Sequence, residues 1–251
     1  MDKGRIKEIV DNPKLTPGIH NYCDRWCERC PMTGHCAVFA MEQDEASGDL
    51  SHDPENAAFW QRLKDALETA LELLGEMAQE AGVDLDALFS EEDEPSRARL
   101  KTEVEEHTLV RQAREYMQRV RKWFESEQLK TQLGLSDVAS KPEVAERSDI
   151  EEVILWYHAF ICAKITRAVR QEREALPASL EDRLRDADGS AKVALLAIDR
   201  CIAAWWQMRG HFPQRKDRMM DFLVRIDRLR KATEEAFPKA RSFVRPGFDE
   251  E

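Results

Sequence analysis

The sequence lacks any long apolar run. No segment approaches the roughly 18 consecutive apolar residues that a membrane-spanning helix requires. The first residues, from Met1 to Lys7, are mostly polar and contain no apolar core of a secretory signal. These two absences predict a cytoplasmic protein with no membrane segment.

Glycine, proline and β-branched runs are also scarce. The 251 residues include only 10 Gly and 10 Pro, and strong helix formers dominate. Apolar residues recur every three or four positions, as on one face of a helix, and do not alternate as in a strand. No phosphate-binding glycine loop, dinucleotide fingerprint or G-x-S-x-G elbow is present. We therefore predict an all-α protein without those nucleotide or hydrolase sites.

Positive charge is in the minority. The chain carries 38 Lys and Arg against 49 Asp and Glu, a net charge of −11. This balance argues against general nucleic-acid binding, which neutralises phosphates with local positive charge. A basic stretch over 214–231 can face an acidic protein or RNA, or only solvent. The partner expected from the sequence is a protein or a small molecule.

Cysteine is infrequent but concentrated. Four of the six cysteines fall within fourteen residues in the pattern C-x3-C-x2-C-x5-C, formed by Cys23, Cys27, Cys30 and Cys36. A thiol behaves as a small apolar group, so such crowding in a polar segment calls for a cause. Structural disulfides are rare in a reducing compartment, and we therefore predict a metal site. Disulfides or free thiols remain the alternative.

The cysteine spacing does not determine which metal binds. Zinc takes four ligands in a tetrahedron, and a C-x2-C turn supplies two of them. A [4Fe–4S] cluster also takes four closely spaced thiolates. His35 can replace one thiolate at a zinc site or serve only as a loop residue. Both a zinc ion and a [4Fe–4S] cluster are therefore carried forward.

Two known motifs resemble parts of this segment. The stretch C-x2-C-P-x4-C from Cys27 to Cys36 resembles the iron–sulfur loop of helix-hairpin-helix DNA glycosylases, which implies a cluster. That family has a longer gap before its second cysteine. The spacing of Cys23, Cys27 and Cys30 matches the cluster triad of radical S-adenosylmethionine enzymes. Those enzymes need a β/α barrel, and this sequence predicts no strands to build one.

The helical pattern predicts three regions. Residues 1–43 form an N-terminal four-cysteine metal-binding module, and 54–237 form a bundle of about five helices. Residues 238–251 form a flexible tail. Acidic linkers are predicted over 44–53 and 84–95.

A second metal site is predicted inside the bundle. Six ionisable residues lie on or beside apolar stripes of three helices: Glu103, Glu106, His107, Glu151, His158 and Asp199. Buried carboxylates need a cation, and carboxylates with imidazoles inside a helical bundle suit Fe or Mn. The set resembles that of ferritin-like di-iron carboxylate proteins, although their Glu-x-x-His motif is absent. The ligands would be Glu103, His107, Glu151, His158 and Asp199. The alternative is that these acids pair with Arg and Lys of neighbouring helices.

Two classes of function follow from these sites. In the first, the protein is a metalloenzyme that uses Fe or Mn in the bundle. In the second, it is a non-enzymatic metal- or redox-responsive binding or regulatory module with a structural zinc.

Overall fold

The computed structural model describes residues 3–46, 57–85, 94–132, 141–174 and 186–249. These residues form eight α-helices and several short 3-10 turns, with no strand among them. The all-α class predicted from the sequence is confirmed. No described helix has the length and apolar character to cross a membrane. Most of the two predicted acidic linkers lies outside the described residues.

The chain divides into two compact units. The first contains residues 1–97 together with 245–251, and the second contains residues 98–244. The predicted module ended at residue 43, whereas this first unit also includes helix α3 (Ala57–Ala81) and the C-terminal residues. Each unit has its own packing.

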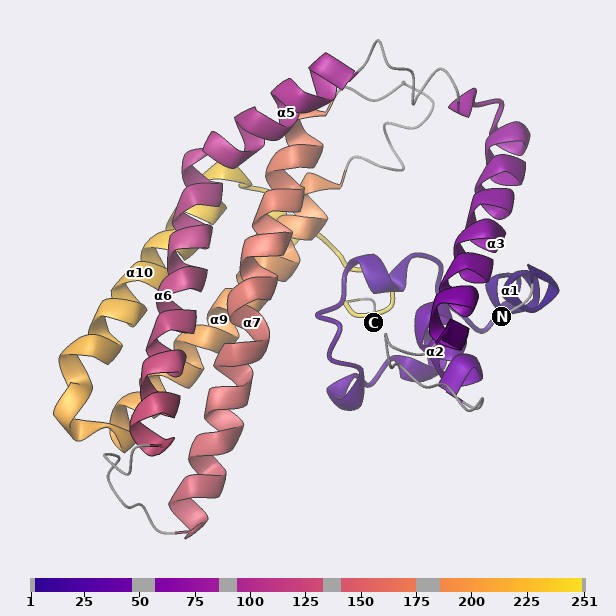
Figure 1. Cartoon of the computed structure of the whole chain (residues 1–251). Coiled ribbons are helices and arrows are strands. Elements are labelled where there is room, and N and C mark those ends of the chain that lie inside the picture. Colours follow the sequence, from indigo (N-terminus) through magenta and orange to yellow (C-terminus); the bar gives the residue numbers. More distant parts are fainter. Residues whose placement is uncertain (1–2, 47–56, 86–93, 133–140, 175–185, 250–251) are drawn as a thin grey trace. The chain divides into compact units, whose positions relative to one another are not determined.

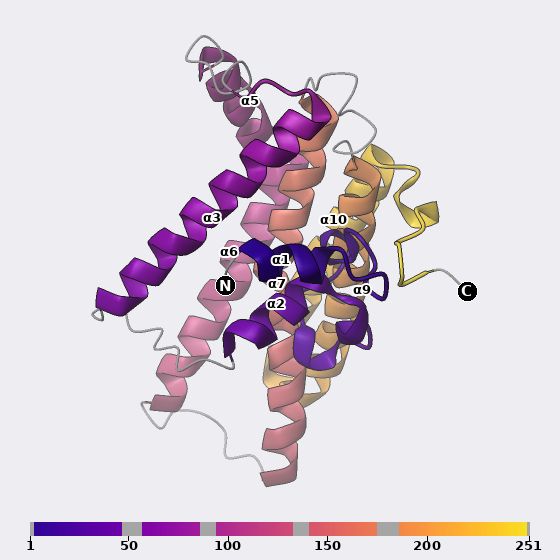
Figure 2. The same ribbon diagram turned by 90° about the vertical axis from the view of Figure 1, so that its right-hand side faces the viewer.

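The second unit is built around four helices, α6 (Thr108–Gln132), α7 (Lys141–Arg173), α9 (Ala187–His211) and α10 (Lys216–Ala236). The helices α6, α7, α9 and α10 contact one another in a closed ring, and they run side by side in both views (Figure 1, Figure 2). Each one buries a stripe of apolar residues at spacings of three and four. On α7, for example, the stripe is Ile150, Ile154, Tyr157, Ile161, Ile165 and Ala168.

Aromatic rings fill one part of this core. The Trp205 ring on α9 stacks on Phe222 of α10, with centroids 4.2 Å apart and ring planes at 9°. Trp123 of α6 meets the Trp205 ring edge-on at 5.6 Å. The indole N–H of Trp205 donates to the hydroxyl oxygen of Tyr116 over 2.8 Å. This pairing satisfies the polar atom of a fully buried indole.

A break at His107 separates helix α5 (Glu94–Glu106) from α6. The helical spacing of apolar residues predicts one continuous helix over 96–130, and the structure interrupts it at this residue. The backbone N–H of His107 bonds to the carbonyl of Val104 over 3.3 Å, a 3-10-type bond, before α6 begins. Because of this break, residues of α5 need not continue the apolar stripe of α6 around the helix axis. Glu103 and Glu106, which lie before the break, are both exposed.

The first unit contains α1 (Lys3–Val10), α2 (Ala37–Ala46) and α3 besides the cysteine segment. Helix α1 contacts α2 and is also tied to α3, because Lys3 and Lys7 both donate to the carboxylate of Glu76. These two ammonium groups lower the pKa of Glu76 to about 2.

The residues after α10 are engaged with their surroundings. Phe237 and Ala240 are buried, and a 3-10 turn, η6 (Ala240–Ser242), follows the helix. The ammonium of Lys192 donates to the carbonyl of Arg241 over 2.7 Å. The sequence predicted a flexible tail from residue 238, and these contacts instead give the segment a defined path along α9.

Candidate metal centre

Three short 3-10 turns set the backbone of the cysteine segment: η1 (Ile19–Asn21), η2 (Cys27–Arg29) and η3 (Thr33–His35). The N–H of Cys30 closes η2 on the carbonyl of Cys27 over 3.2 Å. The N–H of Cys36 closes η3 on Thr33 over 3.3 Å, and the Cys36 carbonyl then accepts the N–H of Ala40 over 3.0 Å. Each cysteine thus lies beside or at the boundary of a turn, and these turns fix the backbone from which its side chain extends.

A strained turn joins the first two cysteines. Arg25, between Cys23 and Cys27, has φ of 59°, and among the described residues it is the one non-glycine with positive φ. The carboxylate of Asp24 accepts the N–H of Trp26 over 3.2 Å within the same turn. Such backbone strain costs roughly 1–3 kcal/mol and persists only where surrounding contacts impose it. Here it reverses the chain within the C-x3-C interval.

All four clustered cysteines line one small hollow of about 20 Å³, the volume that about one water molecule needs. Apolar side chains form much of the wall, among them Ile19, Trp26, Phe39 and Phe248. The Trp26 ring is buried and carries the Arg29 guanidinium 4.0 Å from its centroid. Cys23, Cys27, Cys30 and Cys36 therefore all border one space.

The chemistry of the thiols is compatible with a metal. None of the six cysteines forms a disulfide. The Sγ atom of Cys30 accepts the backbone N–H of Met32 over 3.4 Å, a contact that stabilises a thiolate. Burial and then Glu42 raise the pKa of Cys27, and the neighbouring cysteines add to this effect. A cation in the hollow would offset the negative charges of the thiolates and of the Glu42 carboxylate.

The donor atoms are not gathered around a single point. Among the residues that the structure describes, no three His, Cys, Asp or Glu side chains converge closely enough to hold a metal ion. The thiol of Cys23 instead donates to the carbonyl of His20 over 3.3 Å. Cysteine side chains have three staggered positions about the Cα–Cβ bond, so an Sγ atom can change its position without a change in the backbone.

The C-terminal segment covers this hollow. Phe248 forms part of the wall, and Arg245 and Asp249 close a tight turn through a side-chain ion pair of 2.8 Å. Gly247 lies so close to Ile19 that an added Cβ would be 2.8 Å from the Ile19 Cδ1 atom. Residues more than two hundred positions apart therefore share one site, which sequence spacing could not reveal.

We predict that Gly247→Ala displaces this cover. Gly247 has φ of 75°, and Ile19 is buried with little room to move. The strain and overlap should cost about 1–3 kcal/mol, most of it relieved by detachment of the C-terminal segment. If the hollow binds a metal, that metal should then transfer to a chelator at least about tenfold faster than from the wild-type chain. The matched control is Gly34→Ala, because nothing lies within 4 Å of a Cβ at Gly34. Equal release rates for the two variants would refute the covering role.

Two histidines border the segment. The Nδ1 atom of His35 lies 3.0 Å from the carbonyl oxygen of Lys14, so this nitrogen is engaged outside the hollow. His20 lines the hollow with the cysteines, although the sequence analysis did not single it out. Its position just before the first cysteine was the one available signal. His20, and not His35, is therefore among the residues that line the hollow.

The six residues predicted as a bundle site lie in different surroundings. Glu103 and Glu106 are exposed on α5. His107 lies at the break between α5 and α6, where burial and then Arg173 lower its pKa, and its Nδ1 has no hydrogen-bond partner. On α7, Glu151 is half-buried, while the Nδ1 of His158 is 2.7 Å from the Leu155 carbonyl. No three of them come together as ligands.

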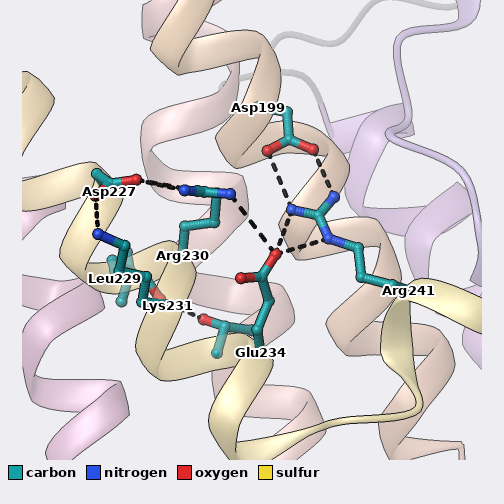
Figure 3. A network of polar contacts seen from close by, with 8 residues as sticks. Asp199, Asp227, Leu229, Arg230, Lys231, Glu234 and Arg241 are labelled. Atoms are coloured by element: carbon teal, nitrogen blue, oxygen red, sulfur yellow. Dashed lines mark hydrogen bonds and ion pairs between the residues drawn. The ribbon is translucent and has the colours of Figure 1, made fainter.

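Asp199, the sixth, belongs to a surface network (Figure 3). The Arg241 guanidinium binds both carboxylate oxygens of Asp199, at 2.5 and 3.2 Å, and also reaches Glu234 at 2.7 Å. Arg230 donates to Asp227 over 2.6 Å in the same network. Asp199 is therefore half-exposed and ion-paired, and its partner Arg241 lies in the turn η6 and not on a neighbouring helix. The acidic residues of this network, among them Asp227 and Glu234, offset part of the positive charge predicted over 214–231.

The two remaining cysteines are part of the bundle core. Burial raises the pKa of Cys201 to about 12 and also raises the pKa of Cys162. Thiols of this kind stay protonated and pack as small apolar groups.

Comparison of the chain with protein-family models, characterised proteins and solved structures finds no match.

Proposed function

We propose that Cys23, Cys27, Cys30 and Cys36 bind one metal centre that holds the first unit together, in a non-enzymatic binding or regulatory protein. The observation that carries this proposal is that four reduced thiols line one hollow, walled by apolar side chains from both ends of the chain. Disulfides do not account for this arrangement as well, since they join thiols in separate pairs. If the four thiols were free, no bound ligand would account for the strained backbone at Arg25.

The energetic need for a metal supports the structural role. The cysteine segment from 11 to 36 contains three short 3-10 turns and few buried side chains, chiefly Ile19 and Trp26. Segments of this size bury too little apolar surface to fold alone. Structural zinc contributes about 10–16 kcal/mol of apparent binding free energy in small domains, and that energy becomes folding energy.

A zinc ion and a [4Fe–4S] cluster both suit four thiolates. Zinc–sulfur bonds of about 2.3 Å would draw the four sulfurs inward around one point. A cluster would instead require the walls to widen beyond the present space of about 20 Å³. In either case the bound centre and its thiolates would carry a net charge of about −2, which Arg25 and Arg29 in the same segment would partly offset.

The geometry favours the non-enzymatic class over the metalloenzyme. The predicted Fe or Mn ligands are dispersed over the bundle, with Glu103 exposed and Asp199 bound to Arg241. The interior between the four helices is filled by apolar and aromatic side chains. We therefore assign the bundle a scaffolding and partner-binding role.

Analysis of anaerobically purified full-length protein tests this proposal. We expect either about one zinc per chain and no visible absorbance, or iron with absorbance at about 400 nm that disappears on oxidation. Protein that contains neither zinc nor iron, even after anaerobic reconstitution, would contradict the proposal. Mass spectrometry of the unreduced chain then tells whether pairs of disulfides take the metal's place.

A further inference from the structure

Helix α3 carries large apolar side chains that are exposed along one face. Six large side chains on it are 41–66% exposed: Trp60, Leu63, Leu67, Leu71, Leu74 and Met77. The contacts with α1 lie on the other side, since Glu76 is nine residues, or two and a half turns, from Leu67. A single helix with so much exposed apolar surface gains little stability on its own.

The spacing on this face is that of a helix pairing with another helix. Over three heptads it alternates three and four without interruption, through Trp60, Leu63, Leu67, Ala70, Leu74, Met77 and Ala81. A strict 3-4 repeat keeps one stripe facing a partner helix along its full length. A helix packed against an irregular surface has no need of that regularity.

We propose that α3 pairs with α3 of a second copy of this chain, in antiparallel orientation. The six side chains expose apolar surface of the order of 500 Å² per copy, so pairing would bury about 1,000 Å² in total, the lower limit for a specific interface. The exposed large apolar residues of the bundle are instead divided among three helices, as with Leu155, Trp206 and Val224.

The charges select the orientation. Residues 57–69 carry two basic and two acidic side chains, whereas residues 70–81 carry three acidic side chains and none that is basic. Parallel pairing would place the two acidic halves against each other. Antiparallel pairing sets each acidic half against a neutral half and also opposes the helix dipoles.

Light scattering coupled to size-exclusion chromatography tests the pairing on the full-length chain. At tens of micromolar we expect twice the monomer mass of 29.0 kDa. Leu67→Glu with Leu74→Glu places two carboxylates in the seam and should weaken association at least 100-fold, to a monomer. The matched control, Gln61→Glu with Gln79→Glu, adds the same charge at exposed positions about 120° around the helix from Leu67 and should stay dimeric.

A wild-type chain that is monomeric up to about 100 μM would overturn the proposal, including the case in which another part of the same chain protects α3. Equal masses for the two double variants would overturn it as well. The pairing does not depend on the metal proposal, because none of the residues lining the hollow lies on α3. A metal-free dimer would refute the metal centre alone, and a metal-loaded monomer would refute the pairing alone.

Discussion

Replacing Cys27 and Cys30 with serine is expected to abolish metal binding and to unfold the cysteine segment, while the bundle stays folded. Cys27 begins the η2 turn, Cys30 directly follows it, and both line the hollow. Serine keeps the side-chain shape but is a poor ligand for zinc or iron. Loss of a structural metal removes up to the 10–16 kcal/mol that its binding contributes, more than the segment's few buried side chains can replace.

Metal content by elemental analysis, with thermal unfolding followed for each unit, would measure this effect. Cys162→Ala is the matched control, because it also removes a thiol but lies in the bundle on α7. The control should keep its full metal content and lose about 1 kcal/mol of stability at most. Wild-type metal content in the serine variant would show that the hollow is not the site.

Trp205→Ala is expected to lower the free energy of unfolding of the bundle by about 3–5 kcal/mol. Trp205 is fully buried, stacks on Phe222 and lies edge-on to Trp123. Its loss would leave a large cavity and also remove the hydrogen bond to the Tyr116 hydroxyl. Since domains are stable by only about 5–15 kcal/mol, this is a large fraction of the total.

Urea unfolding followed by circular dichroism gives this free energy directly. The neighbouring residue provides the control, since Trp206 is 60% exposed and contacts the guanidinium of Arg209. Trp206→Ala should cost less than about 1 kcal/mol. Similar losses for the two variants would contradict the packing described for the core. Metal content should be unchanged in both, because the hollow belongs to the other unit.

The sequence predicted the helices well where apolar periodicity is strong. The stripe through Ile154, Ile161 and Ile165 is fully buried on α7, as its spacing indicated. The prediction failed where periodicity was extended past a break. Glu103 and Glu106 followed the α6 stripe in phase only if the helix continued through His107, and α5 ends just before that residue. Local backbone bonding, which a stripe does not encode, set this boundary.

The grouping of the four loop cysteines was also readable from spacing, because short intervals force them into one region. The residues that cover the hollow could not be read from the spacing. Phe248 and Gly247 carry no motif, and their approach to Ile19 depends on the path of the chain after α10. Asp199 was misleading for a related reason. Its apolar neighbours in sequence suggested burial, but Arg241, from a distant segment, meets it at the surface.

Hydrogen exchange of the wild-type chain, before and after removal of metal by a chelator, tests the central claim most directly. If four cysteines and a metal hold the first unit together, amides over 19–42 should lose most of their protection on chelation, while those of α6, α7, α9 and α10 keep theirs. Unchanged protection over 19–42 in protein verified to be metal-free would contradict the account.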